Sequence, residues 1–216
     1  MGQQATATVI DSFTPETQCQ RMDLQTFVQW QPEEVGHYEL VDGIPTKMQP
    51  TGSHVNIAGF LAAELIFEIR CQKLPYSLPR NCLVQSPDRQ SGYIPDVLVA
   101  HREHLKEEPR WSTASTIENG AMVPLVIEVV STNWSNDYGR KLLDYGQLGI
   151  QEYWIVDYRG LGAARYIGTP KQPTITILQL EDGEYIEAKY RAGDTLISGI
   201  FPDLTLTADE IFAAAD

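Results

Sequence analysis

The sequence predicts one α/β domain in which a mixed β-sheet is flanked by helices. Three observations lead to this prediction: a strand, a helix and a strand follow one another over 125–156, a long helix precedes them at 54–71, and Asp-Gly turns join strand segments near both ends of the chain. A strand, helix, strand unit implies two parallel strands with a right-handed crossover. Asp-Gly turns join antiparallel strands instead, so the sheet should be mixed.

The N-terminal part is expected to contain a short helix over 22–29 and then a β-hairpin. A strand over 38–41 enters the Asp42-Gly43 turn, and 44–48 returns as its partner. The residue pair Asp-Gly between apolar runs is a strong hairpin signal. We therefore predict an N-terminal hairpin.

The helix over 54–71 follows this hairpin. Its apolar residues recur at helical spacing, and Ser53 is expected to cap its first turn. The remaining predicted elements are strands over 83–86, 94–100, 125–130 and 153–156, a helix over 137–148, a C-terminal hairpin of 174–177 with 185–188, and a closing helix capped by Thr207. Strand 125–130 is apolar on both faces, which is typical of a central strand covered on both sides.

Length and composition favour a single domain. The chain has 216 residues, of which 43% are hydrophobic, and this is enough for one buried core and too apolar for disorder. Residues 1–20 are rich in Thr and Gln and lack periodicity, so we expect a flexible tail. One domain should then occupy 21–216.

Charge and cysteine content exclude several classes of function. The chain carries 16 Lys and Arg against 29 Asp and Glu, a net charge of −13, which argues against a broad basic groove and against binding to anionic membranes. No apolar run approaches the ~20 residues of a membrane span, and the three cysteines lack CxxC spacing. We expect a cytoplasmic protein whose contact with DNA would need a local basic patch or metal ions.

Two predicted strands each carry one carboxylate within an apolar run. Asp96 lies in Tyr-Ile-Pro-Asp-Val-Leu-Val-Ala, and Glu128 lies in Leu-Val-Ile-Glu-Val-Val. A buried acid is strongly disfavoured unless a cation, a proton or a hydrogen-bond donor compensates its charge. Asp96 could instead accept backbone N–H groups at a strand end, whereas Glu128 has no local cap to make. The pair suggests a shared positive partner, for which a divalent metal is the first candidate.

From about Tyr38 to Phe212 the chain resembles the Uma2 family, formerly called DUF820, of the PD-(D/E)XK restriction-endonuclease-like superfamily. The matching residues are Tyr38-Glu39-Leu40-Val41-Asp42-Gly43, His54, Pro95-Asp96, Glu128-Val129-Val130-Ser131, Lys141, Tyr145 and the segment Gly149 to Asp157. Their order and spacing over most of the chain carry the resemblance. It implies a restriction-endonuclease-like core around the mixed sheet, with N-terminal and C-terminal hairpins.

The resemblance also implies roles for these residues. Asp96 and Glu128 would bind Mg²⁺ or Mn²⁺, and a lysine would activate or orient the attacking water. The usual lysine position, two residues after the second acid, is Val130 here, so the resemblance places that amine at Lys141 on the next helix. Glu39 would be a third acid of the catalytic site.

Two further residues are candidates for contact with substrate. His54 would contact a phosphate or the metal shell, and Tyr145 shares a helix face with Lys141. Each site residue also has an ordinary structural interpretation. These are a solvated helix face for Lys141, a surface ion pair for Glu39, the start of a helix for His54 and core packing for Tyr145.

The leading functional hypothesis is Mg²⁺-dependent hydrolysis of DNA phosphodiester bonds. Mg²⁺ prefers carboxylate oxygens and keeps several waters, so two acids can hold it while other positions accept phosphate and water. The alternative is an interaction or regulatory module that keeps the nuclease-like fold without efficient cleavage; the acidic net charge and Val130 favour it. A metal-independent hydrolase is disfavoured because no Gly-x-Ser-x-Gly elbow is present. A homodimer would pair two sites for double-strand cleavage.

Overall fold

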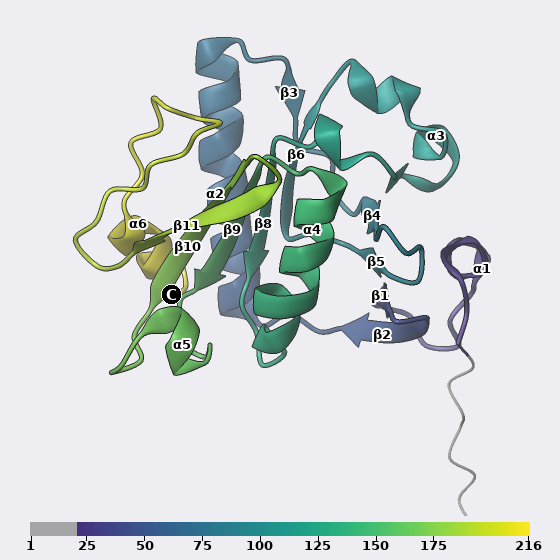
Figure 1. Cartoon of the computed structure of the whole chain (residues 1–216), viewed down its shortest axis with the longest axis horizontal. Helices are drawn as coiled ribbons and strands as arrows, with labels where there is room; N and C mark the ends of the chain where they lie inside the picture. Colours follow the sequence, from purple (N-terminus) through teal and green to yellow (C-terminus); the bar gives the residue numbers. More distant parts are fainter. Residues whose placement is uncertain (1–20) are drawn as a thin grey trace, which may run out of the picture.

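Two mixed β-sheets organise residues 21–216, the part of the chain that this computed structural model describes (Figure 1). The flexible tail expected at 1–20 lies outside the described residues, as does Cys19. The two other cysteines, Cys71 and Cys82, are free thiols. No helix within 21–216 is both long and apolar enough to span a membrane.

The larger sheet has six strands in the order β11-β10-β9-β8-β6-β3. Its strands β8 and β9 are parallel, and every other neighbouring pair is antiparallel. The sheet is therefore mixed, as predicted, and the C-terminal hairpin continues it rather than extending beyond it. The strands are β3 (Tyr76–Ser77), β6 (Val97–His101), β8 (Leu125–Val129), β9 (Glu152–Asp157), β10 (Thr174–Glu181) and β11 (Glu184–Tyr190).

The N-terminal hairpin belongs to a second sheet that the sequence did not predict. This sheet has five strands in the order β2-β1-β5-β4-β7. Three of them have only two or three residues, too few for an alternating pattern to be visible in the sequence. The strands are β1 (His37–Val41), β2 (Ile44–Met48), β4 (Leu83–Gln85), β5 (Gly92–Tyr93) and β7 (Thr116–Ile117).

Both predicted Asp-Gly turns are confirmed. Asp42 and Gly43 have φ of 52° and 78°, and Asp182 and Gly183 have φ of 48° and 88°. Left-handed backbone at both central positions is the type I′ turn that suits the twist of antiparallel strands. These turns fix the register of β1 with β2 and of β10 with β11.

Helices cover both faces of the six-stranded sheet. In Figure 1, α2 lies behind the sheet and α4 lies in front of it. The helices are α1 (Leu24–Gln29), α2 (Gly52–Gln72), α3 (Trp111–Ala114), α4 (Leu142–Leu148), α5 (Ala164–Ile167) and α6 (Ala208–Ala213), with short 3₁₀ segments η1 (His104–Glu107) and η2 (Gly120–Met122). The predicted helix over 137–148 is observed as a π-helical segment, η3 (Asn136–Lys141), that continues into α4.

Several predicted boundaries need correction: α1 begins at Leu24 rather than at residue 22, and β10 and β11 are longer than the predicted 174–177 and 185–188. Helix α2 begins two residues earlier than predicted, and Thr51 caps it instead of Ser53, because the Thr51 side chain accepts the N–H of His54. The strand expected over 94–100 is β6, which starts at Val97, so Asp96 stands just before the strand. Thr207 caps α6 as predicted, in a reciprocal capping box with Glu210.

Strand β8 is central, as its apolar sequence predicts. Leu125, Ile127 and Val129 pack in one core cluster with residues of α2, whereas Val126 and Val130 pack in the other cluster, with residues of η3 and α4. Successive side chains of a strand point to opposite faces. The Glu128 side chain therefore emerges on the α4 face.

A candidate active site at the ends of β6 and β8

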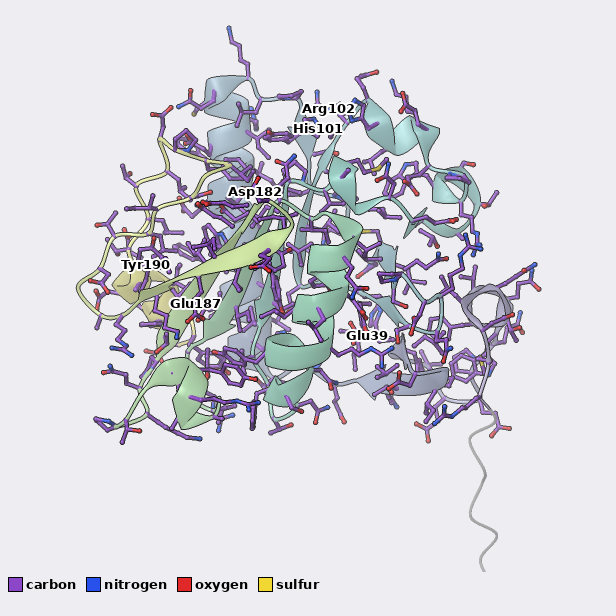
Figure 2. The ribbon with its side chains drawn as sticks, viewed as in Figure 1. Glu39, His101, Arg102, Asp182, Glu187 and Tyr190 are labelled. Atoms are coloured by element: carbon purple, nitrogen blue, oxygen red, sulfur yellow. The ribbon has the colours of Figure 1, made fainter. Side chains whose placement is uncertain are left out.

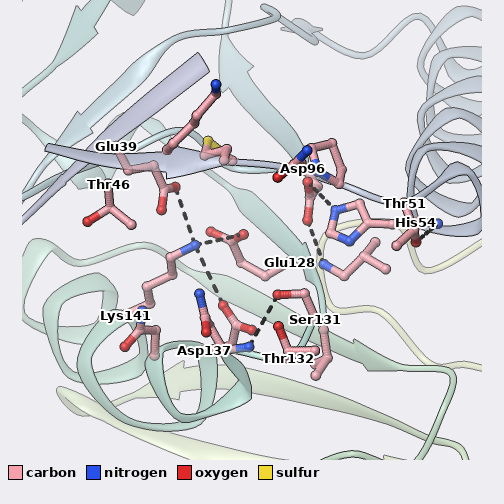
Figure 3. A pocket seen from close by; sticks show the side chains of 18 of the residues that line it. Glu39, Thr46, Thr51, His54, Asp96, Glu128, Ser131, Thr132, Asp137 and Lys141 are labelled. Atoms are coloured by element: carbon pink, nitrogen blue, oxygen red, sulfur yellow. Dashed lines mark hydrogen bonds and ion pairs between the residues drawn. The ribbon is translucent and has the colours of Figure 1, made fainter. Parts of the chain in front are cut away.

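The pairing of β6 with β8 brings the two predicted acids together. The antiparallel register pairs Val97 with Ile127 and Leu98 with Val126, and one further step sets Asp96 opposite Glu128. Residues directly opposite each other project to the same face, with Cβ atoms about 4.5–5.5 Å apart. Both acids accordingly line one pocket of about 330 Å³ (Figure 3).

Both oxygens of Asp96 are engaged. Oδ2 accepts the backbone N–H of Val129 at 2.7 Å, which ties the start of β6 to the end of β8. Oδ1 lies 2.7 Å from Nε2 of His54 in the first turn of α2. The strand-end interpretation of Asp96 is thus satisfied, and its carboxylate still faces the pocket.

Glu128 is held from two sides by buried groups. Its Oε1 accepts the hydroxyl hydrogen of Tyr145 at 2.7 Å, and its Oε2 lies 3.0 Å from Nζ of Lys141. Its side chain is 4% exposed, so these partners replace the water that a carboxylate would otherwise bind.

Lys141 turns inward and does not lie on a solvated helix face. Its side chain is 6% exposed, and its Nζ lies 3.4 Å from Glu39 Oε1 and 3.5 Å from Asp137 Oδ1, in addition to Glu128. The three dashed contacts in Figure 3 converge on this ammonium. Lys141 ends the π-helical turn η3, and the four-residue spacing sets it beside Asp137. Such wide turns often occur at functional sites.

Glu39 reaches the pocket from the second sheet. Its Oε1 accepts the backbone N–H of Ile94 at 2.8 Å, near the Pro95-Asp96 pair. The side chain therefore fixes the segment before β6 and contacts Lys141 at the same time.

Asp137 was not among the predicted site residues. It is buried, lines the pocket and pairs with Lys141. The available signal was its four-residue spacing before Lys141, which places two side chains on one helical face. That spacing is common on solvated helices, so it did not distinguish Asp137 in the sequence.

Buried acid groups outnumber the cations that pair with them in this pocket, because Lys141 lies beside Glu39, Glu128 and Asp137. Burial raises the pKa of Glu128 well above its usual value, and burial raises the pKa of Asp137 to about 6. Burial alone would lower the pKa of Lys141, but Glu128, Glu39 and Asp137 together raise it well above its usual value. Lys141 is therefore an ammonium at neutral pH, whereas Glu128 and Asp137 hold their protons more tightly than exposed acids do, and a cation bound in the pocket would favour their ionised forms.

Tyr145 lies behind Glu128 and not among the residues that line the pocket. Its ring is fully buried, with edge-on contacts to Tyr93 at 5.8 Å and Tyr153 at 5.1 Å between ring centroids. The hydroxyl hydrogen bond to Glu128 fixes that carboxylate. This placement suits a positioning residue better than the substrate contact that the sequence suggested.

The donor chemistry of the pocket suits a hard divalent cation. Asp96 and Glu128 offer carboxylate oxygens, which Mg²⁺ and Mn²⁺ prefer. Within residues 21–216, no three Asp, Glu, His or Cys side chains are arranged as a ready metal site. The Lys141 ammonium lies within ion-pair distance of three of the carboxylates.

The raised pKa of Asp137 predicts a measurable pH dependence of stability in metal-free buffer. Its pKa is about 6 in the folded protein, whereas the ordinary value for an aspartate is 3.8. Between these values the folded state binds more protons than the unfolded state, so the free energy of unfolding decreases as pH rises. Asp137→Asn should reduce this decrease by about 1–3 kcal/mol.

Thermal melts between pH 4 and 7 measure this effect. Asp203→Asn, at an exposed position away from the pocket, is the matched control and should retain the wild-type pH dependence. An Asp137→Asn melting curve with the wild-type pH dependence would contradict the assignment.

The comparisons with known proteins agree with this fold. Residues 24–209 match the family described as "Uma2: Putative restriction endonuclease". A solved structure described as a putative nuclease belonging to DUF820, from Anabaena variabilis ATCC 29413, has a similar fold. The two chains share 14% identity with a TM-score of 0.68, over 90% of this chain and 99% of that chain. A search of curated protein sequences found no match.

The fold is thus that of the nuclease-like DUF820 class, a mixed α/β architecture, and in this chain Asp96 and Glu128 lie at neighbouring strand ends. The family match covers most of the sequence. The chain belongs to the Uma2 family.

Proposed function

We propose that this protein is a divalent-metal-dependent endonuclease that hydrolyses DNA phosphodiester bonds. The observation that carries the proposal is the position of the Lys141 ammonium, 3.0 Å from Glu128 in a pocket that Asp96 also lines. Membership of the Uma2 family supports the same chemistry. An acid pair and an amine in one pocket are the groups that metal-assisted hydrolysis needs.

In this proposal Asp96 and Glu128 would hold Mg²⁺ or Mn²⁺. A bound ion would lower the pKa of a water molecule and offset negative charge on the phosphate in the transition state. His54 orients Asp96 through its 2.7 Å contact, and Tyr145 orients Glu128 through its hydroxyl. Both partners fix the carboxylates before substrate arrives, which reduces the cost of assembling the site.

The positive charge of Lys141 would stabilise the attacking water in its hydroxide form. Its charge is maintained by Glu128, Glu39 and Asp137, so it is a permanent positive group beside the reacting phosphate. Glu39 and Asp137 keep the amine within the pocket. Lys141 would thus take the place of the usual strand lysine, whose position is occupied by Val130.

A second candidate is a binding or regulatory module with a nuclease-like fold. The specific observation in its favour is that Lys141 already pairs with three carboxylates, which provides part of the compensation that a metal would supply. The net charge of −13 also opposes approach of DNA at long range. Cleavage assays separate the two candidates.

The test is cleavage of plasmid and labelled oligonucleotide DNA with Mg²⁺ or Mn²⁺. Wild-type protein should cleave, whereas Asp96→Asn should not. Asp182→Asn is the matched control, because Asp182 lies in the turn between β10 and β11, away from Glu39 and the pocket (Figure 2). It should cleave like wild type.

Two other results would count against an endonuclease. Equal cleavage by Asp96→Asn would point to a contaminating nuclease, and absence of cleavage by wild type together with recovery of a stable protein partner would favour the binding module. Light scattering on the same samples tests whether the protein forms the homodimer that double-strand cleavage would favour.

A further inference from the structure

The connection between β9 and β10 is basic in an otherwise acidic protein. Residues 158–173 contain Arg159, Arg165 and Lys171 and no Asp or Glu. The segment therefore carries a local charge of +3, although the whole chain carries −13. All three cations are exposed.

This segment borders the candidate active site. Arg159 and its neighbour Tyr158 line the pocket that contains Asp96 and Glu128. Figure 1 shows that α5, within this segment, lies at the same end of the molecule as the carboxyl ends of β8 and β9. Arg159 is thus next to the acids, and Arg165 belongs to the helix at that end of the molecule.

No carboxylate in the described part of the chain neutralises these cations. Arg159, Arg165 and Lys171 form no ion pair within residues 21–216, whereas Lys47, another cation of the pocket wall, pairs with Glu34 at 2.8 Å. The acid that precedes the segment, Asp157, is fully buried and accepts two backbone N–H groups, at 2.9 and 2.7 Å. Both oxygens of the Asp157 carboxylate are therefore used within the loop and form no ion pair with the exposed cations.

Contacts with the protein hold this surface in place. The Arg165 guanidinium lies 4.5 Å from the Tyr166 ring centroid and donates to its hydroxyl at 2.6 Å. The Tyr166 ring stacks on Tyr138 at 4.6 Å and contacts Trp134 at 6.3 Å. Trp134 begins the helical turn that leads into η3, and residues Ser131 to Asn133, just before it, line the pocket. Helix α5 is therefore packed against the segment between β8 and α4, part of which forms the pocket wall.

We propose that Arg159, Arg165 and Lys171 form a phosphate-binding surface that receives the DNA strand next to the scissile bond. This inference rests on the proposed nuclease function and specifies where its substrate binds. Lys and Arg contacts to phosphate release counterions and supply affinity that is independent of base sequence. An ordered basic surface beside the pocket would offset the repulsion between DNA and the acidic remainder of the protein.

The experiment compares two triple variants with the same change in net charge. One, the pocket-side variant, replaces Arg159, Arg165 and Lys171 by Gln. The control replaces Arg70, Lys73 and Arg80 by Gln; these exposed cations lie at and beyond the far end of α2, about 30 Å long, away from Thr51 and the pocket. Fluorescence anisotropy of labelled duplex and single-stranded oligonucleotides, with Ca²⁺ in place of Mg²⁺, measures affinity over a range of salt concentrations.

The pocket-side variant should bind DNA about 10- to 100-fold more weakly at low salt, and the slope of log affinity against log salt should decrease by about 2 to 3. The control variant should stay close to wild type. Arg165 and Lys171 also make local hydrogen bonds, so thermal melts accompany the assay. Arg159 donates no hydrogen bond within residues 21–216, so Arg159→Gln alone should leave the fold intact and lower the slope by about 1.

Equal loss in both triple variants would overturn the proposal, because general charge would then explain the effect. Unchanged affinity in the pocket-side variant, or no DNA binding by wild type at the lowest salt, would also overturn it. Failure of the nuclease function has a different signature. Wild type would then bind DNA through this surface but would not cleave it. If the wild type cleaves DNA and the pocket-side variant binds it with unchanged affinity, only the phosphate-binding proposal is refuted.

Discussion

Replacing Lys141 with Met should lower the rate of DNA cleavage by about 10²–10³-fold, the range for loss of one group that stabilises developing charge in the transition state. Met has nearly the same length and fills the buried space, but it has no charge to stabilise hydroxide. The amine lies 3.0 Å from Glu128 and is 6% exposed, so bulk water cannot replace it readily. The rate should fall without loss of the fold.

Metal affinity should be retained or increased in this variant. Lys141 pairs with Glu39, Glu128 and Asp137, and its removal leaves their negative charge available to a divalent ion. Calorimetric titration with Mn²⁺, together with single-turnover cleavage, separates the effects on binding and on chemistry. Lys189→Met is the matched control, because Lys189 pairs with Glu187 on β11, outside the pocket.

A lysine at position 130 should restore part of the lost rate. Val130 packs on the same face of the sheet as Glu128, where the usual strand lysine would emerge. Val130 is 1% exposed, so Val130→Lys in the Lys141→Met background should also lower the melting temperature. Full activity of Lys141→Met by itself would refute the relocated-lysine mechanism.

The second large effect is expected at Glu128. Glu128→Gln should reduce divalent-ion binding and cleavage to below detection, because it removes one of the two carboxylates that would bind the metal ion together. The amide keeps the volume of the side chain and can still accept the hydrogen bond from Tyr145. Mn²⁺ calorimetry and the plasmid assay measure the two losses.

The fold should tolerate Glu128→Gln. Burial raises the pKa of Glu128, so its ionised form costs free energy at neutral pH, and a neutral side chain removes that cost. Glu39 and Asp137 remain as partners for Lys141. The melting temperature should stay the same or rise, and Glu184→Gln on the exposed strand β11 is the matched control. Unchanged metal affinity in Glu128→Gln would assign Glu128 a structural role.

The elements predicted from sequence are those that short local patterns specify. Both Asp-Gly hairpins formed because their residues favour left-handed backbone at adjacent positions. Strand β8, the following helix and strand β9 formed the predicted parallel pair, since their apolar periods are long enough to distinguish helix from strand. The acids at Asp96 and Glu128 stood out because an acid in an apolar run conflicts with burial.

The sequence by itself therefore determined the mixed sheet, the two acidic strand ends and the helix that carries Lys141. The tertiary structure decided which side chains meet. The second sheet, the contact of His54 with Asp96 and the entry of Asp137 into the pocket depend on residues that are distant in sequence or carry no distinctive local pattern. Whether a charged side chain faces solvent or a buried partner is fixed by packing of separate elements, because charge and helical spacing are the same in both cases.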